Sequence, residues 1–472
     1  METNVPGRPL RAEGTSGWAA GDEIIARLER IPLGRWHLQI GGILGAGTLF
    51  DAFDAISIAT VLTVVFTTMH ISFVNSGVLI SAGYAGQFFG AIAGGWLAER
   101  YGRRPVWLVA LACFALLSLG AALSWSFGSL LVSRILQGFG LGAEVPVAAA
   151  LFNEYVRSRH RGLVVTLYES LFPWGLFLAP LVGLGLITWL GPNLGWRVLF
   201  GVGALPLVAC VFAYFRLPES ARWLVNQGRT DQADHIVSQM ENEARAGGAS
   251  LTEPEVRYRA DVKATRITEL FAPAYRRRTI LSWTQWFTIY FISYGFTTWL
   301  PSLYVRIGHL PVSNALILSV VTSGIGIVTY YICALLIDHL GRKTLFLISY
   351  SFFVLGGVFG VVAAGIFHQT GWPVLFITAL LVQLGLFQNG AVYLYTPELY
   401  PTRMRAWATS VGSSINRVAA SIGPILVGVI LAAGLGIGSV IGMFGVVALG
   451  GLVVMAVMGI ETKRRVLEEI AD

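Results

Sequence analysis

The stretch GWLAERYGRR (95–104) ends in charged residues and lies between two long apolar runs of the chain. A stretch of the same pattern, ALLIDHLGRK (334–343), follows 239 positions later and also separates two apolar runs. A second pair, EYVRSRHRG (154–162) and ELYPTRMRA (398–406), repeats at an offset of 244 and shares a glutamate followed by an arginine seven residues later. These repeats predict a chain made of two related halves in the same orientation.

The apolar runs are long enough to cross a lipid bilayer. The 472-residue chain is 55% hydrophobic and 12% charged, whereas soluble globular domains contain about 25% charged residues. About twenty apolar residues span the hydrocarbon core as a helix. We count twelve such segments, at about 36–67, 73–98, 104–125, 128–152, 162–189, 195–216, 279–304, 313–337, 344–367, 373–397, 406–433 and 437–460. The sequence therefore predicts an all-α integral membrane protein with twelve transmembrane helices in two six-helix bundles.

These segments divide the chain into five expected regions. They are a cytoplasmic N-terminal segment (1–35), a first bundle (36–216), a cytoplasmic linker with short helices (217–278), a second bundle (279–460) and a cytoplasmic tail (461–472). Residues 1–35 are polar and charged and contain no apolar core of the kind that cleavable signal peptides have, so we expect no such peptide.

The distribution of basic residues predicts the orientation in the membrane. If both termini are placed on one side, that side holds 29 of the 33 Lys and Arg residues, and the opposite loops hold only Arg197 and Arg306. No Asp or Glu falls in those opposite loops. Because basic residues accumulate in cytoplasmic loops, we expect a multi-pass protein of the plasma (inner) membrane with both termini in the cytoplasm.

The composition also argues against several classes of protein. The net charge of +7 follows from the loop asymmetry and does not indicate a nucleic-acid partner. The three cysteines lie inside apolar runs without metal-ligand spacing. The chain has no phosphate-binding Gly-Lys-Ser/Thr loop and no nucleophile–base spacing, which argues against an enzyme or a primary pump. We expect no cofactor and no metal, and a monomer whose partners are the lipid bilayer, protons and a small solute.

Two aspartates lie in the middle of the first apolar run. Asp51 and Asp54 are three residues apart in TLFDAFDAISIAT (48–60) and therefore share one face of a helix. Charged groups inside a membrane are expensive and usually face a cavity or a partner. Two neighbouring carboxylates cannot both ionise cheaply in a poorly solvated site, so one should hold a proton. We predict that this pair serves proton coupling and that one of the two is essential; a structural ion pair is the alternative.

Three further charges of the first half lie inside apolar runs. Glu144 follows Arg134 by ten residues in the fourth segment, which is about 15 Å along a helix, so the two are not partners. We expect Arg134 to bond an acid of another helix, and an aspartate of the first segment is the candidate. Glu169 lies about two turns into the fifth segment, where it suits proton transfer, closure of an inner gate or a structural role. We include Arg134, Glu144 and Glu169 among the proton-coupling candidates.

The second half has one intramembrane charge, Arg417, near the middle of the eleventh segment. Arginine keeps its proton and presents a planar fork that fits a carboxylate. We expect it to bind an organic anion; a permanent ion pair with an acid of the first half is the alternative. Polar and aromatic neighbours in this half suit a flat aromatic acid and complete the predicted substrate site: Asn416, Trp286, Tyr290, Tyr294, Gln388, Asn389 and Tyr393.

Two motifs resemble the major facilitator superfamily of transporters. The family's loop G-x-L-x-D-x-x-G-R-K/R is matched by Gly95, Leu97, Gly102, Arg103 and Arg104, with Glu99 in place of the aspartate. Its copy in the second half retains Asp338, Gly341, Arg342 and Lys343, with Ala334 in place of the first glycine. RILQGFGLGAEVP (134–146) matches the pattern R-x-x-x-G-x-x-x-G-x-x-x-P through Arg134, Gly138, Gly142 and Pro146.

The resemblance covers the chain from about residue 36 onward and implies the two-bundle fold, with a substrate site between the halves. Its loop charges imply a cytoplasmic latch that must break before the carrier opens inward. The loop acid can accept hydrogen bonds from helix N-termini and from an arginine of the neighbouring loop. Simple anchoring of the topology is the alternative role. The predicted gating residues are Glu99, Arg103, Arg104, Asp338, Arg342, Lys343, Glu154, Arg161, Glu398 and Arg405.

Different features resemble different branches of the superfamily. PESARWL (218–224) resembles the sugar porters, although the glutamine motif of their seventh helix is absent. The paired acids, Glu169 and Arg417 resemble the bacterial nicotinate and aromatic-acid proton symporters, whose anion-carrying members have an arginine here that is associated with the substrate carboxylate. This implies a proton-coupled importer of a small organic anion such as nicotinate, working by alternating access. A sugar carrier, an organic-cation carrier and a transporter-like receptor are the alternatives.

Overall fold

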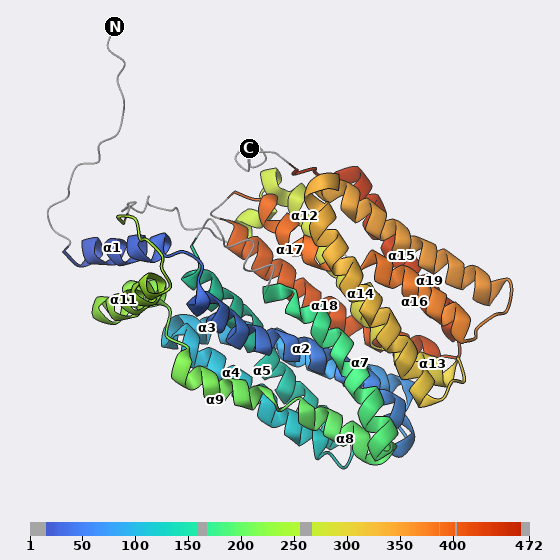
Figure 1. The fold of residues 1–472 in the computed structure, drawn as a ribbon. Coiled ribbons are helices and arrows are strands. Elements are labelled where there is room, and N and C mark those ends of the chain that lie inside the picture. Colours follow the sequence, from blue (N-terminus) through green and yellow to red (C-terminus); the bar gives the residue numbers. More distant parts are fainter. Residues whose placement is uncertain (1–15, 158–167, 255–266, 387, 402–403, 464–472) are drawn as a thin grey trace, which may run out of the picture.

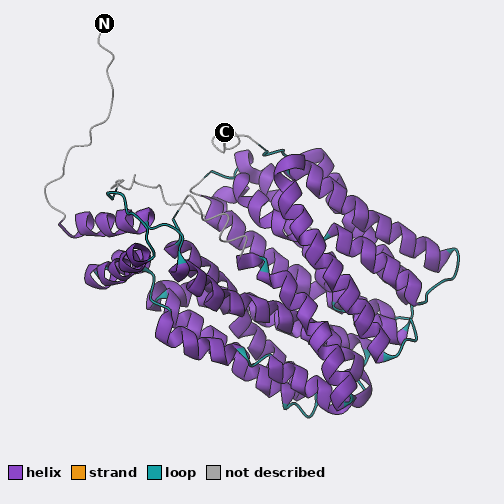
Figure 2. Ribbon diagram, in the orientation of Figure 1, coloured by secondary structure: helices purple, strands orange, loops and turns teal. Residues whose placement is uncertain are grey.

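The structure, a computed structural model, describes residues 16–157, 168–254, 267–386, 388–401 and 404–463. All regular secondary structure in these residues is helical (Figure 2). Two groups of long helices lie side by side, and a smaller group protrudes at one end (Figure 1). The smaller group is formed by α1 (Ser16–Arg30), α10 (Ala221–Asn226) and α11 (Thr230–Ala246). We call this end the terminal side, since the chain also leaves the structure there after Lys463, and the other end the opposite side.

The long helices follow the twelve predicted segments. The first group contains α2 (Arg35–Thr68), α3 (Phe73–Tyr101), α4 (Arg103–Ala122), α5 (Phe127–Tyr155), α7 (Leu171–Leu190), α8 (Pro192–Val202) and α9 (Pro206–Arg216). A short 3-10 turn, η2 (Ile267–Phe271), precedes the second group. That group contains α12 (Pro273–Thr297), α13 (Leu300–Arg306), α14 (Val312–Leu340), α15 (Arg342–Gly365), α16 (Trp372–Gly385), α17 (Gln388–Glu398), α18 (Arg405–Ala432) and α19 (Gly436–Met458).

Eleven helical stretches of the described chain are long and apolar enough to cross a membrane. The remaining predicted segment, 279–304, is formed by α12 and α13, whose many polar and aromatic residues lower the hydropathy. Three predicted segments consist of two helices each, namely α8 with α9, α12 with α13, and α16 with α17. Pro206 and Pro301 stand at the start of the second helix in two of these cases, where the missing proline N–H is tolerated. The predicted all-α, multi-span architecture is confirmed, while its division into five regions stays a prediction.

Glycines allow the backbones of α3 and α5 to touch. A Cβ atom added to Gly138 would lie 2.1 Å from the carbonyl oxygen of Gly83, and one added to Gly142 would lie 2.1 Å from that of Gln87. From the other side, a Cβ at Gly90 would lie 2.0 Å from the carbonyl oxygen of Phe139. Any side chain would force the helices apart, so these positions need glycine. This close packing aligns the charged residues of α5 with the interior of the first group.

The protruding group has its own small core and is held by charge. Ile24 and Leu28 of α1 are buried against Trp223 of α10 and Val237 of α11. Beside this core, the Glu241 carboxylate of α11 accepts hydrogen bonds from two arginines of α1. Their closest contacts are 3.0 Å from Arg27 and 2.6 Å from Arg30. Burial raises the pKa of Glu241, but the hydrogen bonds and charges of both arginines outweigh burial and lower it.

We predict that acid or the substitution Glu241→Gln undocks α1. Because the pKa of Glu241 is lower in the folded state than its ordinary value of 4.5, its contribution is complete above that value. The contribution disappears as the pH falls through the lowered pKa. Spin labels at the exposed positions Glu23 and Gln239 should report a short distance at pH 7 and a broad distribution in acid. Glu241→Gln should give the broad distribution at both pH values, and an unchanged short distance would contradict the prediction.

Candidate functional site

The predicted bond between Arg134 and an acid of the first span is present. Nη1 of Arg134 (α5) lies 2.6 Å from Oδ2 of Asp54 (α2), and both side chains are almost completely buried. Gln137, one turn after Arg134, donates to Oδ1 of the same carboxylate at 2.7 Å and accepts from Arg134 at 2.7 Å. Its amide also donates to the hydroxyl of Ser118 (α4). Asp54 is thus held on both oxygens, as expected for a charge kept in the membrane interior.

Asp51 has a different environment from Asp54. It lies one turn earlier in α2 and is only 7% exposed. Its Oδ1 has no hydrogen-bond partner within the part of the chain that the structure describes. Arg417, Asp54, Glu169 and Arg134 are all close enough to act on it electrostatically. The two aspartates therefore differ, because both oxygens of Asp54 have partners, whereas Oδ1 of Asp51 has none among the described residues.

The other two predicted acids, Glu144 and Glu169, lie in the first half with Asp51 and Asp54. Glu144 (α5) is 1% exposed, and its Oε1 accepts a hydrogen bond of 2.7 Å from Nε1 of Trp107 (α4). Its Oε2 has no partner among the described residues. Glu169 precedes α7, is half-buried and acts electrostatically on Asp51 and Glu144. Asp51, Asp54, Glu144 and Glu169 thus form one electrostatic cluster, and of these four acids Asp54 alone has an arginine partner among the described residues.

Arg417 faces this cluster from the second half. It lies in α18 and is 8% exposed. Its Nη1 donates to the carbonyl oxygen and the hydroxyl of Ser413 at 2.9 and 2.7 Å, and its Nε has no partner among the described residues. It makes no ion pair with a described acid, so the predicted alternative of a permanent pair does not occur in this conformation. Asn416, the residue before it, is half-buried.

A ladder of aromatic rings lies on α12. The ring of Tyr290 stacks on Trp286 at 5.7 Å and on Tyr294 at 5.8 Å, with interplanar angles of 14° and 18°. Tyr393 of α17 meets Trp286 edge-on at 4.7 Å. Trp286 is fully buried, and its Nε1 donates to Thr396 at 2.9 Å, whereas Tyr393 is 38% exposed. Tyr393 is therefore the more accessible of these rings for a solute.

Two amides at the start of α17 have atoms without a hydrogen-bond partner in the part of the chain that the structure describes. Gln388 is fully buried, and neither atom of its amide has a hydrogen-bond partner among the described residues. Oδ1 of the neighbouring Asn389 is also without one. Leaving a buried amide unsatisfied costs about 1–3 kcal/mol per group. These amides are therefore suited to bind a polar group that enters from outside the protein.

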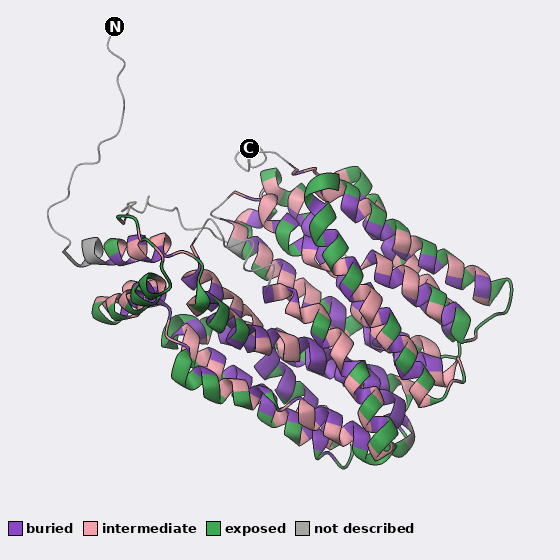
Figure 3. Ribbon diagram, viewed as in Figure 1, coloured by how far each residue is buried: buried purple, intermediate pink, exposed green. Residues whose placement is uncertain are grey.

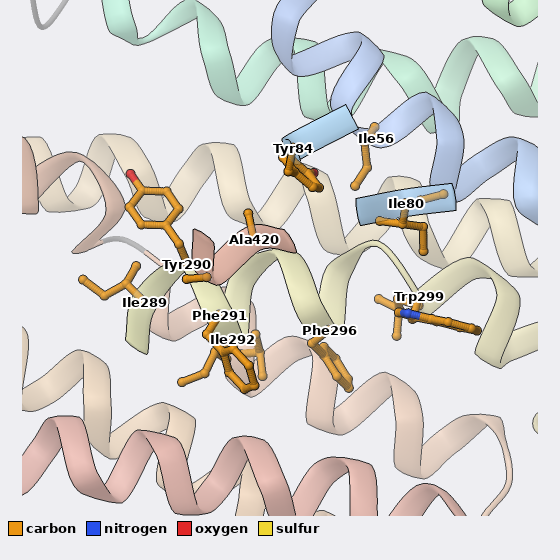
Figure 4. Packing of buried hydrophobic residues seen from close by; sticks show 14 of the residues in the cluster. Ile56, Ile80, Tyr84, Ile289, Tyr290, Phe291, Ile292, Phe296, Trp299 and Ala420 are labelled. Atoms are coloured by element: carbon orange, nitrogen blue, oxygen red, sulfur yellow. The ribbon is translucent and has the colours of Figure 1, made fainter. Parts of the chain in front are cut away.

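The two halves contact each other through α3 with α18 and α7 with α14. The hydroxyl of Ser81 (α3) donates to the carbonyl oxygen of Ser421 (α18) at 2.6 Å, and Tyr84 (α3) meets Tyr294 at 4.8 Å. Figure 4 shows Ile56, Ile80 and Tyr84 of the first half packed across from Tyr290, Trp299 and Ala420 of the second. Figure 3 shows buried residues concentrated along α2, in the middle of the molecule. The charged cluster therefore lies between two bundles that pack tightly beyond it.

Two small hollows occur near these residues. One, of about 200 Å³ between α3 and α18, has Arg417 at its edge. Its other lining includes the exposed apolar side chains of Phe89 and Ile422, so it opens toward lipid and does not fit a polar solute. The second, of about 10 Å³, lies between the halves and is lined by residues such as Thr60, Thr297 and Ser323.

The predicted latch residues form one network in each half. Arg103 bonds Glu154 at 3.3 Å in the first half. In the second, Arg342 bonds Glu398 at 2.9 Å and Asp338 at 2.8 Å. The described ion pairs of these residues stay within their own half. In this conformation the loop charges therefore tie each half to itself.

Glu99 takes no part in the latch contacts of the described residues, and its gating role stays a prediction. Glu99 is exposed, and its side chain makes no hydrogen bond or ion pair among the described residues. The backbone N–H groups of Arg103 and Arg104 instead donate to Glu219, at 3.0 and 3.2 Å. Burial raises the pKa of Glu219, although these N–H groups and that of Ser220 counteract the effect. The N-terminus of α4 is thus capped by Glu219, a half-buried acid distant in sequence, and not by the exposed Glu99 of its own loop.

The second half repeats this arrangement with Glu461, another residue that the sequence reasoning missed. The carboxylate of Glu461 accepts from the backbone N–H groups of Arg342 and Lys343 at 2.9 and 3.0 Å. Both capping acids follow the last span of their half directly, Glu219 within PES and Glu461 within IET. The position directly after the last span, which both acids share, is the sequence signal that could have identified them. Arg405 donates to the carbonyl oxygen of Tyr400 at 3.1 Å, and Arg161 lies outside the described residues.

Two pseudo-repeated helical bundles with a charged, buried site between them define a solute carrier of the major facilitator type. The sugar (and other) transporter family model matches residues 44–472, so the chain belongs to this family, and it is a transporter rather than an enzyme. It is 32% identical to the niacin transporter NiaP of Acinetobacter baylyi over 454 residues, 95% of this chain and 99% of that protein. It is 30% identical to the gallate transporter of Pseudomonas putida over 82% of this chain and 84% of that protein.

A crystal structure described as that of a D-xylose–proton symporter has the same fold. The two superpose with a TM-score of 0.70 over 91% of this chain and 99% of the symporter. Their sequence identity is 17%, so the likeness concerns the fold alone. The chain is thus a multi-pass membrane transporter of small metabolites, related to transporters of niacin and aromatic acids.

Proposed function

We propose that the protein imports a small organic anion, an aromatic monocarboxylate such as nicotinate, together with protons. The observation that carries the proposal is the pairing of two unsatisfied groups across the halves. Arg417 brings a fixed positive charge with an unbonded Nε, and Asp51 brings a carboxyl with an unbonded oxygen. No described acid forms an ion pair with Arg417, so a substrate carboxylate can bind it in two-point contact.

The same geometry supplies a coupling mechanism. When Asp51 is ionised, its negative charge acts on Arg417 and competes with an incoming anion for it. Protonation of Asp51 removes this competition, so proton binding and anion binding favour each other. Release of the proton on the far side restores the competition and expels the anion. The ring ladder of α12 and the exposed face of Tyr393 offer stacking surface for a flat substrate.

A neutral sugar is the second candidate, because one observation favours it. The fully buried Gln388 amide offers unpaired donors and an unpaired acceptor. It can hydrogen-bond the hydroxyl groups of a sugar just as it can the ring nitrogen of nicotinate. A sugar leaves the charge of Arg417 without a role, and we therefore place the anion first. We further propose the plasma (inner) membrane, cytoplasmic termini and a monomer as the working state.

Uptake by the purified protein in proteoliposomes tests this function. Labelled nicotinate and benzoate should accumulate when the outside is more acidic than the lumen, and accumulation should stop when a proton ionophore collapses the gradient. Labelled xylose and tetraethylammonium, offered in the same vesicles, should enter no faster than in protein-free liposomes. Accumulation of xylose or of the cation without that of either acid would reject the organic-anion assignment.

A further inference from the structure

Arg306 connects the two halves on the opposite side of the molecule. It is the last residue of α13, in the second half, and its guanidinium lies over the ring of Phe66 (α2) in the first half. The same group is 5.0 Å from the ring centroid of Phe73, at the start of α3. The two rings meet edge-on, with centroids 5.4 Å apart and an interplanar angle of 74°. The rings of Phe66 and Phe73 thus contact the Arg306 guanidinium from two sides, and we call them the aromatic seat of Arg306.

The rings are the partners that hold this cation. The side chain of Arg306 is half-buried and makes no hydrogen bond or ion pair among the described residues. The loops on this side of the chain contain no Asp or Glu that could pair with it. A guanidinium over an aromatic face is attracted by the ring quadrupole, and the attraction grows when water is excluded. At Arg306 the contact between the halves is therefore a cation–π contact and not an ion pair.

This seat lies directly above the packed interface. The ring of Phe73 also approaches Trp299 of the second half, at 6.2 Å between centroids. A Cβ atom at Gly428 of α18 would lie 2.6 Å from the carbonyl oxygen of Phe73, so the backbones touch there. The start of α3 is thus held by α13 and α18 together. Below it lies the small hollow of about 10 Å³ that Ser323 helps to line.

We propose that Arg306, Phe66 and Phe73 form a cation–π gate that closes the solute path on the opposite side. Alternating access requires the halves to separate there, and they cannot do so unless the guanidinium leaves both rings. The strength of this contact then sets how often that side opens. Because no acid takes part, the gate should be insensitive to ionic strength, unlike one built on an ion pair. The proposal concerns the transport cycle and does not depend on the identity of the substrate.

Thiol labelling of a cysteine beneath the gate tests the proposal. The reporter is Ser323→Cys in full-length protein whose native cysteines are replaced (Cys113→Ala, Cys210→Ala, Cys333→Ala). A membrane-impermeant maleimide is applied to the opposite face in sealed vesicles. Arg306→Met should speed labelling about tenfold, and Arg306→Lys, which keeps the charge, should give a smaller increase. Phe66→Leu should resemble Arg306→Met, and the double variant should add little, because both changes remove one interaction.

The chain provides a matched control for charge and for folding. Arg197, the other arginine of the opposite loops, lies over Trp196 at 4.2 Å within the first half. Arg197→Met should therefore leave the labelling rate unchanged. Each variant is compared by its size-exclusion profile in detergent, and Phe66→Leu replaces Arg306→Met if the latter does not fold. Labelling at the wild-type rate in folded Arg306→Met or Phe66→Leu, or fully additive effects in the double variant, would overturn the gate.

Discussion

Replacing Asp51 by asparagine is expected to abolish accumulation of substrate driven by a pH gradient while leaving exchange of substrate across the membrane intact. The amide keeps the shape of the Asp51 side chain and removes its ability to bind a proton. The reason to choose Asp51 lies in its unbonded oxygen and its electrostatic contact with Arg417. The measurement is uptake of a labelled aromatic acid with and without a gradient, beside counterflow exchange in the same vesicles.

Asp54→Asn is the matched comparison, three residues away on the same helix. It leaves Arg134 buried without its partner, which typically destabilises a protein by about 3–5 kcal/mol. We therefore expect a lower melting temperature for Asp54→Asn and a nearly unchanged one for Asp51→Asn. If the Asp51→Asn protein still concentrates substrate against a gradient, proton coupling resides elsewhere in the acidic cluster, and Glu144→Gln and Glu169→Gln become the next variants.

Replacing Arg417 by glutamine is expected to weaken binding of an aromatic acid by roughly 10- to 150-fold. This range corresponds to about 1.5–3 kcal/mol for a buried, charge-assisted hydrogen-bonded pair. Arg417→Lys keeps the charge but lacks the planar fork. Its affinity for the acid should therefore lie between that of the unmodified protein and that of Arg417→Gln. Binding is measured as the dissociation constant of the purified protein for nicotinate, by isothermal titration in detergent.

The neutral amide of the ligand supplies the complementary control. Nicotinamide should bind the unmodified protein poorly, and Arg417→Gln should bind acid and amide with similar, low affinity. Thermal melting of each variant without ligand shows whether the fold is retained. Equal binding of the acid by the unmodified protein and folded Arg417→Gln would remove this arginine from the substrate site, without affecting the assignment of Asp51.

The fold and the charged part of the site could be predicted because a charged residue inside a membrane span is energetically costly. Every charge within an apolar run has to find a partner or a function, and this reasoning led from Arg134 to an acid of the first span, now seen as Asp54. Gln137 and Trp107, which donate hydrogen bonds to Asp54 and Glu144, were missed. A neutral polar side chain in a long apolar run carries little penalty, and so little signal.

The terminal side was harder to predict for the opposite reason. Charges near water are common, so the exposed acid Glu99 and the capping acid Glu219 look alike in the sequence. The structure separates them by burial, since the N–H groups at the start of α4 are covered by Glu219. Pairings within one half, such as Arg103 with Glu154, depend on which loops meet in space. The sequence repeats indicate that such a network exists, but they do not show which residues pair with one another.

The backbone contact between α3 and α5 has a mechanical consequence. Gly138 rests on the carbonyl oxygen of Gly83 with no side chain between them, and a contact of this kind has no rotamers with which to yield. We therefore expect this pair of helices to turn as a stiff plate during the cycle. The bending must then fall where a helix is interrupted beside the binding residues, between α12 and α13. The first half would then move as a rigid body during transport, while the second half changes its own shape.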